Sequence, residues 1–138
     1  MALDRWGRVL LRRRDYDDNL SVGPGRDCWE LPGVVMGPFE SPDEAAIRGF
    51  EENTDHLLDQ VRLFRVYRRA TDLPSALVDV QHVYYDDPDL DVANIACQEG
   101  QEFRYFAVEA LPLAEMAPPH RVIVEDFVNG TAYRALFH

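Results

Sequence analysis

The segment Ser41–Glu44, with the sequence S-P-D-E, is the strongest local constraint on how this chain folds. Serine can cap a helix, proline suits the first helical position, and glutamate three residues after the serine completes a capping box. These signals predict a helix from about residue 42 to about residue 54. Ala46, Ile47 and Phe50 can supply its apolar side. A helix with a well-defined first turn is therefore expected in the first half of the chain.

Strands are predicted around this helix from the turn at Gly7 and from apolar alternation, which is imperfect over residues 61–69 and clearer over 77–85. We expect them at residues 9–14, 61–69, 77–85 and 103–108, with a short extended piece at 29–31. A short helical turn is expected at 109–115, and a last helix from 118 to a stop at Asn129-Gly130. The 138 residues contain no repeat and no linker, so one α/β or α+β domain over residues 1–138 is predicted.

Two single residues receive an interpretation from this pattern. Gly7 is the turn residue that leads into the first strand. His82 falls on the alternating apolar side of the strand at 77–85, so we interpret it as a buried core histidine with satisfied hydrogen bonds.

Charge restricts the possible partners. The chain has 25 acidic and 14 basic residues, every basic residue is arginine, and the net charge is −11. Such a surface repels polyanions, so nucleic acid polymers and anionic membranes are poor partners. An anionic small molecule is still a suitable ligand if a local cation holds it.

The first residues argue against export or membrane insertion. The stretch MALDRWGRVLLRRR carries arginine where a signal peptide needs an apolar run. No apolar run approaches the length needed to cross a bilayer. We therefore expect a cytoplasmic protein.

The region 29–56 carries the pattern on which a functional prediction rests. It reads WELPGVVMGPFESPDEAAIRGFEENTDH and resembles the Nudix box, G-x5-E-x7-R-E-U-x-E-E-x-G-U with U apolar, which W-x-L-P-G commonly precedes. The lead-in matches at Trp29, Leu31, Pro32 and Gly33, and the box matches at Glu40, Arg48, Phe50 and Glu52. Downstream, EGQEFRYF and APPHR also resemble the tail of bacterial Nudix domains.

The resemblance implies a fold and a reaction. The fold is a Nudix-like α/β/α sandwich with a mixed β-sheet, forming a single Nudix domain with the box helix on one side and the C-terminal helix on the other. The reaction is water attack on a nucleoside diphosphate linked to another moiety, with magnesium or manganese as cofactor. The ligand would be a small anionic nucleotide.

The resemblance also assigns roles to individual residues. Glu52 would be the surviving metal ligand and a catalytic residue, with Glu40, Glu51 or the catalytic candidate Glu102 assisting. Gly33, Glu40 and Arg48 would be structural, with Arg48 pairing with Glu40 to brace the loop.

Five of the nine specified box positions depart from the pattern. Val34 replaces a glycine, Gly49 and Asn53 replace glutamates, and Asp55 and His56 replace the closing glycine and apolar residue. Family glutamates at i, i+3 and i+4 share one helix face, so that three carboxylates converge on the metal. Only one carboxylate remains on that face here.

The neighbouring acid does not repair this loss. Glu51 lies about 100° round the helix axis from Glu52 and should point elsewhere. Gly49 also weakens the helix by up to about 1 kcal/mol relative to alanine, with no structural return evident from the sequence. We expect weak or lost hydrolase activity, with magnesium or manganese as cofactor if activity remains and no cofactor if it is lost. The alternative is a non-catalytic Nudix domain that binds a nucleotide or a protein.

The start of the chain raises the question of a partner subunit. A Nudix chain normally begins with a full strand before its D-x-x-G turn, but only Met1, Ala2 and Leu3 precede that turn here. Either the recorded start is late, or a sheet position is left for something else to fill, such as a second copy. The sequence thus predicts a possible homodimer.

Overall fold

A computed structural model describes residues 1–14, 28–70, 78–95 and 101–137. Its strands are β1 (Val9–Arg14), β2 (Trp29–Glu30), β3 (Arg62–Ala70), β4 (Val78–Tyr85) and β5 (Gln101–Phe106). Its helices are α1 (Pro42–Thr54), α2 (Pro118–Val128) and α3 (Thr131–Leu136), with 3-10 turns η1 (Val92–Asn94) and η2 (Val108–Leu113). Within these ranges, every helix is too short or too polar to span a bilayer.

The strands form two antiparallel sheets. One has the order β2-β1-β5, and the other is the hairpin of β3 and β4. Among the described residues, parallel pairing is limited to the isolated bridges Ala2–Asp86 and Trp29–Met116. The mixed character expected for the sheet is therefore confined to these bridges.

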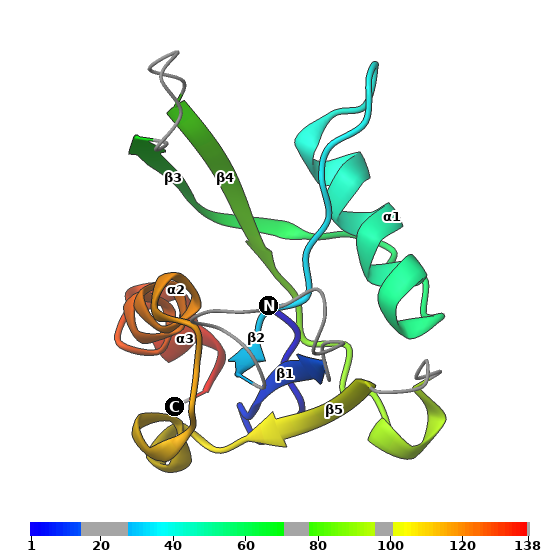
Figure 1. Ribbon diagram of the computed structural model, residues 1–138. Helices are drawn as coiled ribbons and strands as arrows, with labels where there is room; N and C mark the ends of the chain where they lie inside the picture. Colours follow the sequence, from blue (N-terminus) through cyan, green and yellow to red (C-terminus); the bar gives the residue numbers. More distant parts are fainter. Residues whose placement is uncertain (15–27, 71–77, 96–100, 138) are drawn as a thin grey trace, which may run out of the picture.

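Strand β1 lies at the centre of the sandwich. Leu10 packs in a cluster with Phe50 of α1, whereas Leu11 packs in a second cluster with Ile123 and Phe127 of α2. Successive side chains of a strand point to opposite faces, so β1 contacts the two helical layers alternately. Figure 1 shows α1 on one side of the β1 sheet and the pair α2 and α3 on the other. The predicted α/β/α arrangement is confirmed.

The segment before β1 fills a strand position within the chain itself. Ala2 bridges to Asp86 just after β4, and Leu3 bridges to Val9 of β1. Both residues are buried. The described chain thus joins its two sheets through this short segment, and the homodimer stays a prediction without support from a vacant strand position.

Helix α1 begins as the sequence predicts. Ser41 accepts a hydrogen bond from the backbone N–H of Glu44, and the Glu44 side chain accepts one from the backbone of Ser41, which completes the capping box. The helix ends at Asp55, which has a left-handed backbone (φ 59°) and donates its N–H to the carbonyl of Glu51. This is the position at which the box pattern has glycine, so aspartate here holds a conformation that glycine adopts without strain.

The end of the chain differs from the prediction. The stop at Asn129-Gly130 is real, but α3 follows it immediately. Tyr133 of α3 donates its hydroxyl to the carbonyl of Gly7, at 2.7 Å. Gly7 has φ 78°, and a Cβ there would lie 2.5 Å from that hydroxyl. The tight turn into β1 and the last helix therefore depend on each other.

Strand β4 has its exposed and buried sides opposite to our expectation. Val83 is buried, whereas His82 is exposed and Val80 is 45% exposed. The interpretation of His82 as a buried core histidine is wrong. His82 lines a cavity together with Val80, Tyr84 and residues of α1. The alternating apolar side chains on this side of β4 therefore face the cavity and not the core.

We predict that Asp55→Gly raises the free energy of unfolding by about 1 kcal/mol, because glycine removes the left-handed strain and a negative charge at the helix C-terminus. Urea denaturation at neutral pH measures the change. Asp59→Gly is the matched control, since Asp59 is exposed and its φ is not positive. Equal effects of the two substitutions would contradict the assignment to backbone strain.

Candidate functional site

The loop before α1 is braced by one arginine. Arg48 donates from Nε and Nη2 to the two carboxylate oxygens of Glu40, at 2.7 and 2.9 Å, and from Nη2 to the Val35 carbonyl, at 3.0 Å. Glu40 also accepts from the Gly37 N–H, at 2.8 Å. The hydrogen bonds from Arg48, helped by that from Gly37, hold the pKa of Glu40 at about 2, against an ordinary value of 4.5.

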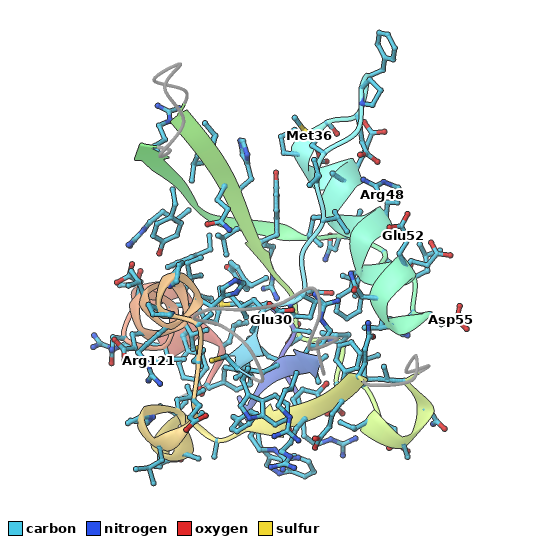
Figure 2. The ribbon with its side chains drawn as sticks, viewed as in Figure 1. Glu30, Met36, Arg48, Glu52, Asp55 and Arg121 are labelled. Atoms are coloured by element: carbon cyan, nitrogen blue, oxygen red, sulfur yellow. The ribbon has the colours of Figure 1, made fainter. Side chains whose placement is uncertain are left out.

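The same arginine holds the remaining box glutamate. Arg48 donates from Nη1 to Oε1 of Glu52, at 3.0 Å, across one turn of α1. Figure 2 shows both side chains on the side of α1 turned away from the β3–β4 hairpin. Glu52 is 57% exposed, so water reaches it, but its nearest charged partner is a cation of its own helix.

Gly49 of α1 is covered by the loop that precedes this helix. A Cβ at this position would lie 2.4 Å from both methyl groups of Val34 and 2.9 Å from its Cβ. No side chain fits there while Val34 is in place. The departures at positions 34 and 49 are therefore sterically coupled, because the Val34 side chain takes the space of a side chain at position 49. This is the structural return for Gly49 that the sequence did not reveal.

Asn53 is held by a buried arginine from the sheet. Its Oδ1 accepts from Nη1 of Arg12, and its Nδ2 donates to the Gly49 carbonyl, at 2.7 Å. Arg12 lies on β1 with its side chain only 7% exposed, and its Nη2 also donates to Glu30, at 3.1 Å. In Figure 2, Glu30 lies to the left of the C-terminal end of α1. A guanidinium thus lies against the helix position that carries the third glutamate in the box pattern.

Glu102 lies on the other face of the sheet. It is the cross-strand partner of Arg13, whereas Arg12 and Glu30 are partners on the opposite face. Its two carboxylate oxygens accept from Arg13, at 2.8 Å, and from Arg104, at 2.7 Å. Both guanidinium groups stack 5.1 Å from the centre of the Trp29 ring. The structure therefore does not bring Glu102 to the face that Glu52 occupies.

The residues on this face do not fit a divalent metal. Mg²⁺ and similar ions need several hard oxygen ligands, usually carboxylates. Of the described residues, no three aspartate, glutamate, histidine or cysteine side chains lie close enough together to hold one. Glu52 is paired with Arg48, and the neighbouring positions carry glycine and an amide bonded to Arg12.

A cavity of about 550 Å³ opens behind the box loop. Its walls come from the lead-in and loop, α1, β4 and α2, and include Gly33, Val34, Met36, Ala45, Phe50, Val80, His82, Tyr84, His120 and Ile123. Most of these side chains are apolar. His120 accepts the N–H of Leu31 on Nδ1, at 2.9 Å, so α2 anchors the lead-in beside Gly33.

Two contributors were not assigned a role from the sequence. Arg12 has no predicted role, yet its side chain is buried and donates to Glu30 and Asn53. A usable signal was its alternation with Leu10, which places it on the face that α1 covers. His120 was only part of a resemblance at the start of the last helix, and no local pattern links it to Leu31, which lies 89 residues earlier.

These features define a class: an α/β sandwich domain whose loop–helix segment, braced by an arginine–glutamate pair, borders a ligand-sized cavity. A sequence model of the NUDIX domain matches residues 2–127. The chain belongs to the Nudix family.

Relatives support this assignment. A Bacillus subtilis (strain 168) protein, provisionally assigned as an 8-oxo-dGTP diphosphatase, is 27% identical over 122 residues, or 88% of this chain and 71% of the relative. The MutT Nudix hydrolase structure from Burkholderia pseudomallei has TM-score 0.68 and 24% identity, covering 90% of this chain and 92% of that one. The Nudix domain of Shewanella oneidensis NrtR, solved with ADP ribose, has TM-score 0.64 and 17% identity, covering 88% and 76%.

We predict that Gly49→Glu alone destabilises the fold by about 1–3 kcal/mol, because its Cβ overlaps Val34. Combining it with Val34→Gly removes the overlap, so the double variant loses less stability than the two single variants summed. Urea denaturation of all four proteins gives the coupling free energy, which we expect to be at least about 1 kcal/mol. Additive effects would contradict the steric coupling.

The low pKa of Glu40 predicts an acid-sensitive loop. Because the folded-state pKa (about 2) lies below the ordinary value (4.5), the stabilisation is complete above about pH 4.5 and is lost as pH falls toward 2. We expect the urea midpoint of the wild type to fall more steeply over this range than that of Glu40→Gln, which has no carboxylate to protonate. Parallel curves would show that the Arg48 pair adds no such stability.

Proposed function

We propose that this chain binds a nucleoside diphosphate derivative and hydrolyses it weakly or not at all. Nudix hydrolases generally use divalent metals. The observation that carries the proposal is the loss of free carboxylates on the face of α1 formed by positions 49, 52 and 53, here called the box face. Glu52 is paired with Arg48, position 49 has no side chain, and Asn53 is neutral and bonded to Arg12. A single paired carboxylate gives weak support for a metal-assisted attack by water.

The cavity beside the box loop supports a nucleotide-type ligand. Its volume of about 550 Å³ falls in the range of small-molecule sites. Apolar walls suit a flat base, and His82, Tyr84 and His120 add polar groups to the lining. The Shewanella domain was solved with ADP ribose, and the Bacillus relative is named for a nucleotide substrate. The net charge of −11 argues against a nucleic acid polymer.

Protein binding is the second candidate function, and the loop before α1 favours it. Val35 is 89% exposed, Met36 is half exposed, and Phe39 is completely exposed with a left-handed backbone (φ 64°). Exposed apolar side chains concentrated on one loop are typical of interaction surfaces. This function uses the same Nudix fold and needs no metal.

A ligand and turnover panel tests the proposed function. ADP-ribose, 8-oxo-dGTP, nucleotide sugars, dinucleoside polyphosphates and nucleoside triphosphates are assayed for binding by calorimetry. Cleavage of the diphosphate linkage is followed by chromatographic detection of the nucleotide products, with Mg²⁺, Mn²⁺ or EDTA. We expect saturable binding of at least one of them and hydrolysis near background, with Glu52→Gln and its control Glu51→Gln equal to the wild type.

Two outcomes would contradict the proposal. Turnover of about 1 s⁻¹ or faster, in the ordinary enzymatic range, that is abolished by Glu52→Gln but not by Glu51→Gln would establish a working hydrolase. Failure of every nucleotide to bind would leave protein binding as the function that the loop supports.

A further inference from the structure

We propose that Arg12 and Val34 have together replaced the divalent-metal site of this Nudix domain, so that the chain binds its diphosphate ligand without divalent metal. The inference deepens the proposed function and rests on it for the identity of the ligand. It is carried by the contacts of positions 34, 49 and 53 with one another and with the sheet below α1.

The first part of the replacement is steric. The Val34 methyl groups lie where a side chain of residue 49 would begin, 2.4 Å from its Cβ position. Gly49 is buried as a result. A carboxylate therefore cannot reach the metal face from this position without a change in the loop.

The second part is electrostatic. Arg12 is fixed in the interior by Glu30 on the neighbouring strand and by Asn53 above it. Both ends of the Asn53 amide are used, because Nδ2 donates to the Gly49 carbonyl. A glutamate at 53 has no donor for that carbonyl, and its nearest cation is the guanidinium. It would form a salt bridge with Arg12 instead of presenting a free carboxylate to a metal.

The third part concerns what a ligand meets in place of a metal. The Arg12 guanidinium lies beside position 53, where the box pattern places a carboxylate, and so disfavours a divalent cation there. Arg12 is buried, but Arg48 is 37% exposed at the rim of the loop. Arg48 makes four hydrogen bonds with described residues, and a guanidinium has five N–H groups. Arg48 thus has one N–H group left that a diphosphate oxygen can accept from.

Direct metal binding tests the replacement without any enzymatic readout. Mn²⁺ binding is measured by electron paramagnetic resonance on three proteins: the wild type, Val34→Gly/Gly49→Glu/Asn53→Glu, and that triple variant with Arg12→Met/Glu30→Gln added. Removing Arg12 together with Glu30 leaves no unpaired buried charge. Adding Arg13→Met to the triple variant is the matched control, because Arg13 lies on the opposite face of β1.

We expect no saturable Mn²⁺ binding by the wild type and weak binding by the triple variant. Removal of the Arg12–Glu30 pair should tighten binding by about tenfold or more, and Arg13→Met should leave it unchanged. Circular dichroism confirms that each protein is folded. Stoichiometric Mn²⁺ binding by the wild type, or equal affinity with and without Arg12, would overturn the inference.

Ligand binding separates the inference from the proposed function. Calorimetry with ADP is performed in EDTA and in Mg²⁺, and the inference expects the same Kd in both. Binding that requires Mg²⁺ would overturn metal independence and leave the proposed nucleotide binding intact. If ADP and the rest of the nucleotide panel fail to bind under either condition, the proposed function fails, and with it metal-independent ligand binding, whereas the Mn²⁺ measurements still decide whether the metal site is lost.

Discussion

The burial of β1 on both faces is the constraint on which the rest of this domain depends. Val9, Leu10 and Leu11 have no exposed surface, and Arg12 has almost none. Because successive side chains alternate, the strand supplies the core of α2 with one set of residues and the underside of α1 with the other. A guanidinium in such a strand must find its partners in the protein interior. Glu30 and Asn53 are those partners. Because Asn53 belongs to α1, the hydrogen bonding of the buried Arg12 depends on where α1 packs on the sheet.

The box face illustrates how a functional site changes under packing constraints. Three of the five departures from the Nudix pattern have a neighbour that accommodates them. Val34 fills the space over Gly49, and the Arg12 guanidinium donates to the side chain of Asn53. The parts of the box that hold the loop in place are kept, since Arg48 still bonds Glu40. The scaffold of the site and its metal chemistry are therefore separable properties of this fold.

Local signals in the sequence predicted the local structure well. The capping box, the turn at Gly7 and the alternation of β1 depend on residues close together in the chain, and each appears where expected. The errors concern tertiary context. Alternation shows that His82 and Val83 lie on opposite sides of β4, but it does not show which side meets the core. The contact of Val34 with Gly49 spans 15 positions of the numbering and depends on the path of a loop that no periodicity describes.

The enclosed position of Gly49 also has a consequence for how this protein can change over generations. Its contact with Val34 makes the order of substitutions matter. A chain that gains the glutamate first must tolerate an overlap in its interior, whereas a chain that loses the valine first passes through a more open loop. Only the second order avoids a steric overlap at this point. The Val34 side chain therefore disfavours a direct change of Gly49 to glutamate.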